Sequence, residues 1–546
     1  MRVPLMGMLL AVLCLAGSAQ EKTASERPID LWLTAVGRQH HQIQTTSREA
    51  QTYFDQGLTL VYGFNHEEAE RSFRRASELD PASPMPLWGV AMAVGPNYNL
   101  EVDARREKQA YDTIQKAQEL AANAPQIEKD YVAALAARYS AEGSPNYKQL
   151  ALDYANAMGN LSRKYPDDLD AATLYASSLM NLNPWKLWSL DGQPGERTEE
   201  IVHVLESVLM RSPHHAGANH LYIHALEASP HPERALQSAR RLETLVPHAA
   251  HLVHMPAHIY IRTGDYDAAA KNNVEALSVD KTYLQRSGPF AGMYDILYYS
   301  HNLHFLSAAE SMAGNFAGAK RAADELEAHI LPMVKEMPDA EVYLPTPIFV
   351  LLRFHRWEEL LKSTPPDASL AMTSALWHFG RGCAAAATGK TEMAKQERKI
   401  LEAVRTKTSE TEAFGMFFTS AREFLDLAAI ALDARLAMAR GDNDRAVEYW
   451  TMAVRAQDRF RYNEPPEWFY PVRESLGAAL LASGKAAEAE QVFREDLRRN
   501  PRNPRSLFGL MNSLNAQGKN ADAAGVERQF KTAWKNADSA LKVSDL

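Results

Sequence analysis

The sequence predicts an all-helical protein of the α-solenoid class, in which antiparallel helix pairs stack one after another. Its 546 residues exceed what one compact core needs. Patterns typical of a helix pair recur about every 34 residues, while sustained period-two alternation between hairpin turns is scarce. A stacked array buries a continuous core between neighbouring pairs, so the length requires no single hydrophobic centre.

The N-terminus is expected to be a signal peptide spanning residues 1–19. An apolar run from Leu5 to Ala16 follows Met1-Arg2 and ends in small residues. Cys14 follows Leu13 rather than a small residue, which disfavours a lipid anchor. No later stretch holds 18 uninterrupted apolar residues, so we expect no membrane span after signal cleavage and a periplasmic or secreted protein.

Charge and cysteine content exclude several functional classes. The formal charge of -9 comes from mixed basic and acidic residues, which argues against nucleic acid as a partner. After signal removal only Cys383 remains, which excludes an internal disulfide, an iron–sulfur cluster and a Cys-rich zinc site. Any metal must therefore be held by His, Asp or Glu.

The repeats define the expected organisation. Residues 467–500 place Gly477 in a first helix, Gly484 at the turn and Phe493 in a second helix, followed by Pro501. This resembles the tetratricopeptide pattern, which implies a right-handed superhelix of antiparallel helix pairs. The expected divisions are an N-terminal segment at 20–50, tetratricopeptide and divergent pairs at 51–212, central His-rich repeats at 213–330, helical repeats at 331–425 and C-terminal repeats at 426–546.

Histidines concentrate in the central repeats, where 12 of the 18 lie between His203 and His304. The turns at Gly264 and Gly314 align successive repeats, and in the tetratricopeptide pattern certain positions of each first helix face the concave groove. Seven histidines fall at such positions of three successive first helices. They are His220, His224, His251, His254, His258, His301 and His304.

These seven histidines are predicted to bind metal. Residues three or four apart share a helix face, and packed helices lie about 8–10 Å apart, so imidazoles from neighbouring helices converge. Three or four would satisfy one ion, and seven suffice for two. One division gives His220, His224 and His258 to a first ion and His251, His301 and His304 to a second, with His254 between.

Two acidic residues are expected near this site. Glu227 lies one turn beyond His224 and is the candidate catalytic residue as a general base on metal-bound water; it could equally be a ligand or an outer partner of an imidazole. Asp295 is a candidate outer partner. His214, His215, His231 and His248 lie in turns, and most of them are expected to be solvated. His40 and His41 precede the first repeat, where folding back on the array is one option for them.

Particular strings resemble a group of exported bacterial tetratricopeptide-repeat proteins. They are Tyr62-Gly-Phe-Asn-His-Glu-Glu-Ala69, Trp88-Gly-Val-Ala91, Gly95-Pro-Asn-Tyr98, Gly217-Ala-Asn-His-Leu-Tyr-Ile-His224, His254-Met-Pro-Ala-His-Ile-Tyr260 and His301-Asn-Leu-His304. The resemblance runs from about His40 to the last repeats. It implies the fold and export, and it supplies no catalytic assignment.

Several functions fit these features. A metal-dependent oxidoreductase with a mono- or dinuclear centre would use copper in preference to zinc or iron, because copper binds nitrogen ligands most tightly. A zinc hydrolase with Glu227 as base is a second enzyme class. The non-enzymatic alternatives are a metal carrier and a scaffold that binds a protein or peptide partner in the groove.

Overall fold

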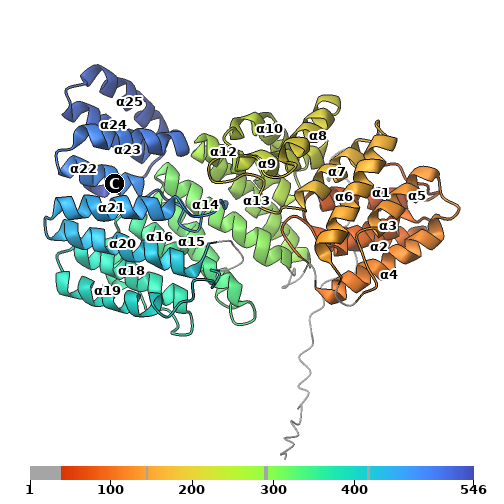
Figure 1. The fold of residues 1–546 in the computed structure, drawn as a ribbon, viewed down its shortest axis with the longest axis horizontal. Helices are drawn as coiled ribbons and strands as arrows, with labels where there is room; N and C mark the ends of the chain where they lie inside the picture. Colours follow the sequence, from red (N-terminus) through yellow and green to blue (C-terminus); the bar gives the residue numbers. More distant parts are fainter. Residues whose placement is uncertain (1–38, 102, 143–144, 288–292, 415–418) are drawn as a thin grey trace, which may run out of the picture.

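The computed structural model describes residues 39–101, 103–142, 145–287, 293–414 and 419–546. The predicted signal peptide lies outside these residues. The described part is helical throughout, with isolated β-bridges but no strand, and its helices pack in sequence-adjacent pairs (Figure 1). The predicted all-α, tetratricopeptide-type solenoid is confirmed. No described helix is long and apolar enough to cross a membrane.

The N-terminal part holds one regular pair and several divergent ones. Its helices are α1 (Arg48–Tyr62), α2 (His66–Leu79), α3 (Met85–Val94), α4 (Ala104–Ala121), α5 (Gln126–Ala136), α6 (Tyr147–Lys164), α7 (Leu169–Met180) and α8 (Thr198–Arg211). The stretch between α7 and α8 is a loop that contains Asn183-Pro184-Trp185 and Asp191-Gly192.

The central part carries the histidines. Its elements are α9 (Ala216–Glu227), η2 (Pro232–Ala235), α10 (Leu236–Leu245), α11 (Ala250–His254), α12 (Pro256–Thr263), α13 (Tyr266–Ser287), the π-helical η3 (Asp295–Tyr299), α14 (Ser300–Ala313) and α15 (Phe316–Ile330). Pro256 lacks a backbone N–H and divides what would be one first helix into α11 and α12.

The C-terminal part continues the stack. Its elements are η4 (Pro338–Tyr343), α16 (Thr346–Arg353), α17 (Trp357–Lys362), α18 (Ala371–Ala387), α19 (Thr391–Arg405), α20 (Ala421–Ala439), α21 (Asn443–Gln457), α22 (Arg473–Ala482), α23 (Ala486–Arg499), α24 (Pro504–Ala516), α25 (Asn520–Ala533) and η5 (Val543–Asp545). In this part, too, helices that are adjacent in sequence pack against each other in pairs.

Phenylalanines in second helices interlock the pairs. Phe493 of α23 packs so closely between Gly477 of α22 and Gly509 of α24 that a Cβ at either glycine would lie 2.3 or 2.2 Å from its ring. Phe73 sits in the same way between Gly57 and Gly89. Only glycine leaves room there, which explains why small residues recur opposite aromatics in the sequence.

The C-terminal repeats also touch the central ones. Arg502 donates to the carbonyl oxygen of Thr263 at 2.7 Å, and the Tyr266 hydroxyl donates to that of Pro501 at 3.1 Å. Gly264, in the left-handed conformation at φ 77°, lies against Pro501, where a Cβ would clash. The end of α12 therefore lies beside the α23–α24 turn (Figure 1).

Candidate metal centre

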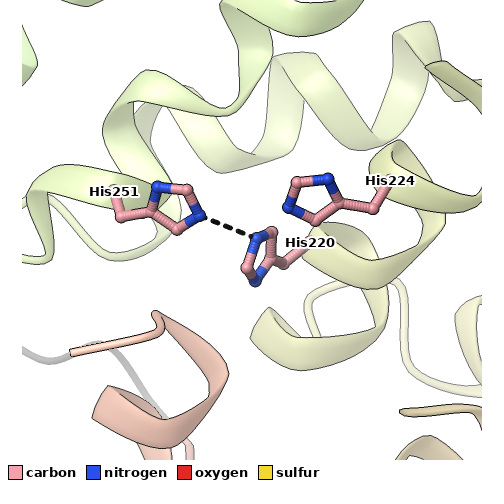
Figure 2. Close-up of side chains that lie close together, drawn as sticks. All are labelled: His220, His224 and His251. Carbon is pink, nitrogen blue, oxygen red and sulfur yellow. Dashed lines mark hydrogen bonds between the residues drawn. The ribbon is translucent and has the colours of Figure 1, made fainter. Parts of the chain in front are cut away.

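The first triad consists of His220 and His224 on α9 and His251 on α11. Each ring can offer one nitrogen, and these three nitrogens lie within 4.8 Å of one another. The Nε2 atoms of His220 and His251 are 3.2 Å apart, and His224 turns its ring toward both (Figure 2). The Nε2 atom of His224 is buried without a hydrogen-bond partner. A buried nitrogen of this kind is costly unless a ligand satisfies it.

The second triad consists of His254 on α11, His258 on α12 and His301 on α14. The Nε2 atom of His254 lies 2.8 Å from that of His258 and 3.0 Å from that of His301, and the third separation is 3.4 Å. Nitrogens bound to one tetrahedral ion at about 2.0–2.1 Å lie about 3.3–3.4 Å apart. The three nitrogens therefore need only small adjustments to hold one ion.

The outer ring nitrogens are fixed by acceptors. The Nδ1 atom of His220 lies 2.5 Å from the carbonyl oxygen of Tyr62, and that of His254 lies 2.8 Å from Oδ1 of Asn273. The Asn273 amide nitrogen donates to Ala269, so its oxygen faces the ring. Because these partners accept hydrogen bonds, Nδ1 carries the proton and the Nε2 lone pair points inward.

Glu227, at the end of α9, joins the two triads. One carboxylate oxygen lies 2.8 Å from Nδ1 of His224, and the other contacts Nδ1 of His258. Burial disfavours its charged form, but the two imidazoles outweigh burial and lower the pKa of Glu227 to about 2. This geometry suits an outer partner of two ligands, whereas the catalytic role expected for Glu227 requires an oxygen free to reach a water.

Burial favours the neutral form of the His251 and His301 imidazoles. Burial, reinforced by repulsion between neighbouring imidazolium charges, holds the pKa values of His251 and His301 well below the usual range. Neutral imidazole is the form that binds metal. The three histidines of the first triad are at most 3% exposed, whereas His301 is only partly buried.

Aromatic rings flank both triads. Phe64, in the turn between α1 and α2, packs on all three rings of the first triad at 4.5 to 5.7 Å between centroids. Phe305 packs on the three rings of the second at 5.0 to 5.7 Å. Neither phenylalanine was predicted from the sequence, although Phe64 lies in one of the strings that carry the family resemblance.

The structure groups the seven predicted histidines differently from the expected division. His251 joins His220 and His224, while His258 joins His254 and His301. His304 belongs to neither triad: its ring packs against Tyr343 at 5.6 Å between centroids, and burial lowers its pKa to about 4. It lies three residues beyond His301 on α14.

The structure places three further residues, Asp295, His215 and His41, outside the two triads. Asp295 lies 3.1 Å from Nε2 of His329 and has no contact with either triad. His215 is buried rather than solvated, and its ring lies 3.1 Å from Asp170. His41 folds back onto the array, and its Nδ1 atom lies 3.0 Å from Oδ2 of the same Asp170 carboxylate. His41, Asp168 and Asp170 form a third group whose geometry could hold an ion.

Comparison with known families identifies one segment of the chain. Residues 50–83, which contain α1 from Ala50 onward and α2, match the family described as tetratricopeptide repeat. These residues form a tetratricopeptide repeat. The same helix–turn–helix pairing of this tetratricopeptide repeat recurs in the central and C-terminal parts.

Two solved structures are similar to this chain along most of its length, at low sequence identity. A human IFIT1 dimer with m7Gppp-AAAA is 14% identical, with a TM-score of 0.31, and the match covers 90% of this chain and 91% of that chain. A human IFIT1 dimer with PPP-AAAA is 13% identical, with a TM-score of 0.32 and coverage of 91% and 92%. No curated protein matches the sequence significantly.

Proposed function

We propose that the protein binds two copper ions, one in each histidine triad, and uses them as an oxidoreductase that reduces dioxygen. The observation that carries this proposal is the convergence of three imidazoles in each of two adjacent triads. His224 and His258 lie 5.6 Å apart between ring centroids, and His251 and His254 lie 5.8 Å apart. Two ions at such neighbouring sites can share the electrons that dioxygen accepts.

The donor set favours copper over the other metals considered. Both triads are built from imidazole alone, which suits copper, and copper binds such nitrogen donors most tightly among the divalent ions. Non-haem iron sites of the facial type include a carboxylate ligand, whereas both oxygens of Glu227 contact outer ring nitrogens. A zinc hydrolase is disfavoured for the same reason, because it needs that carboxylate as a base.

The non-enzymatic alternatives have less support. A metal carrier must release its ion. Here hydrogen bonds to the Nδ1 atoms fix the orientation of four rings for metal binding, which favours retention of the ion. These rings belong to His220, His224, His254 and His258. A peptide-binding groove needs exposed side chains, and six of the seven predicted histidines are at most 4% exposed. In this proposal the signal peptide directs the oxidoreductase to the periplasm or the exterior.

Metal analysis of paired variants tests the proposal. Protein expressed with copper, zinc and iron supplied should contain two copper ions per chain. The double variants H220A/H251A and H254A/H301A should each keep one ion, and H304A should keep both. Wild-type protein should consume oxygen with hydroquinone, and both double variants should not. Absence of stoichiometric metal, or bound metal without oxygen consumption, would refute the oxidoreductase.

A further inference from the structure

The first triad is enclosed, which limits how a reducing substrate can deliver electrons to an ion bound there. The residues His220, His224 and His251 are 0%, 2% and 3% exposed, and Phe64 packs against the rings of all three. An organic molecule the size of a phenol therefore cannot contact an ion held there. Electrons for such an ion must pass through protein side chains.

One pair of aromatic residues connects this triad to the surface. Tyr98, which is buried, packs against His224 with 5.5 Å between ring centroids. Trp185 stacks on Tyr98 at 5.4 Å and meets the edge of His224 at 6.1 Å. Trp185 itself is only partly buried. A single readily oxidised indole thus lies next to a predicted ligand on one side and near solvent on the other.

The backbone at Trp185 is conformationally strained. Its φ of 59° lies in the left-handed region, which bulky residues rarely adopt. Phe64, on the same triad, has a φ of 55°. A hydrogen bond attaches the loop between α7 and α8 to α9: the Trp188 indole donates to the carbonyl oxygen of Ala225 at 2.7 Å. Strained residues of this kind cluster at functional sites.

We propose that Trp185 is the port through which planar aromatic reductants of the hydroquinone class deliver electrons to the first triad. This inference rests on the proposed function. Hydroquinone docks against the indole and loses two electrons, one at a time, releasing two protons to solvent and becoming quinone. The two electrons pass beside Tyr98 to the centre. There dioxygen takes up both electrons and two protons from solvent, giving hydrogen peroxide.

A second route exists and serves as the competing explanation. Tyr298 packs on His251 at 4.7 Å, and Tyr294 and Tyr283 continue the series at 5.2 and 5.1 Å. Tyr298, Tyr294 and Tyr283 are all buried, at 6%, 5% and 2% exposure, whereas Trp185 is only partly buried. A tyrosine loses its proton on oxidation, and burial opposes charge separation there. The indole of Trp185 is therefore the favoured port.

Two aromatic substitutions separate electron transfer from packing. Trp185→Phe and Trp185→Tyr both keep a ring that can stack on Tyr98, but only tyrosine is readily oxidised. In copper-loaded protein, Trp185→Phe should lower kcat/KM for hydroquinone by about tenfold or more, equivalent to at least about 1.4 kcal/mol of barrier. Trp185→Tyr should retain most of the activity. Trp357→Phe, on α17, is the control and should match wild type.

Anaerobic mixing supplies a second measurement. The rate at which hydroquinone reduces the oxidised protein, followed by copper absorption, should fall in Trp185→Phe alone, with copper content unchanged. Equal rates for Trp185→Phe and Trp185→Tyr overturn this inference while leaving the oxidoreductase intact. Loss of rate in Tyr298→Phe instead assigns the port to the tyrosine route. A wild-type protein without bound copper or oxygen consumption overturns both proposals.

Discussion

The carboxylate of Glu227 contacts the Nδ1 atoms of His224 and His258, so one side chain orients a ring in each triad. These two histidines lie in different repeats and on different helices, α9 and α12. A single charge therefore supports both predicted ion sites. This link distinguishes a joined two-ion centre from two independent sites.

Glu227→Gln should weaken binding at both sites together. The amide oxygen can still accept from one ring, but its NH₂ group faces the other Nδ1–H, so one ring loses its partner and both lose the negative charge. Loss of an outer partner typically costs about 10- to 100-fold in metal affinity. Calorimetric titration with copper measures this change.

The control for this variant is Glu243→Gln, because Glu243 on α10 accepts from Tyr260 and contacts neither triad. Its copper affinity should equal that of wild type. Loss of one ion only, with the other site unaffected, would contradict a shared role for Glu227.

Metal removal should lower thermal stability. A ligand bound only by the folded chain stabilises it by about 2.7 kcal/mol at 100 times its Kd, and each triad joins separate helices. Scanning calorimetry with and without a chelator should show a fall in Tm that copper reverses. The combined variant H220A/H254A should show a smaller fall, and an unchanged Tm in the parent would count against ions that bridge helices.

Gly477→Ala should destabilise the C-terminal repeats. A Cβ there would lie 2.3 Å from the ring of Phe493, and overpacking of this kind typically costs about 1–3 kcal/mol. Gly525→Ala on α25 is a matched control, because its nearest neighbour is a flexible arginine tip at 3.9 Å. Alanine should stabilise that helix by about 0.5–1 kcal/mol. Urea unfolding measures both, and changes of equal sign would disprove the packing argument.

Stability should fall between about pH 4.5 and 7 because of Glu467. Burial raises the pKa of this carboxyl to about 7. The folded chain therefore holds its proton more tightly than the unfolded chain does, so the contribution is full below the unfolded value and declines as the pH rises to the folded value. A shift of this size corresponds to about 3 kcal/mol.

Glu467→Gln keeps the shape without the ionisation. Chemical unfolding at pH 5 and pH 8 should show wild type losing stability relative to the variant at the higher pH. A parallel dependence in both proteins would exclude Glu467 as the source.

Local patterns were sufficient to predict the helix pairs. Turn glycines such as Gly264 and Gly314 mark the repeats, and the aromatic–glycine interlock at Phe493 follows from the same spacing. His220 and His224 could be placed on one face because they lie four residues apart on one helix.

The composition of the triads could not be predicted, because it depends on how neighbouring helices rotate. Pro256 breaks the first helix between His254 and His258, so periodicity alone does not fix the direction of either ring. Phe64 reaches the first triad from a turn that is distant in sequence. The repeat position of His304 predicted that it would lie at the metal site, but its ring packs against Tyr343 instead.

The contact of Pro501 and Arg502 with the Thr263–Tyr266 turn has a consequence for folding. In an open solenoid each repeat contacts only its neighbours, so repeats can be lost one by one from an end. Contacts that span more than 230 residues raise the contact order and couple distant repeats. The C-terminal repeats and the histidine-bearing repeats should therefore unfold as one cooperative unit, and truncating the former should loosen the latter.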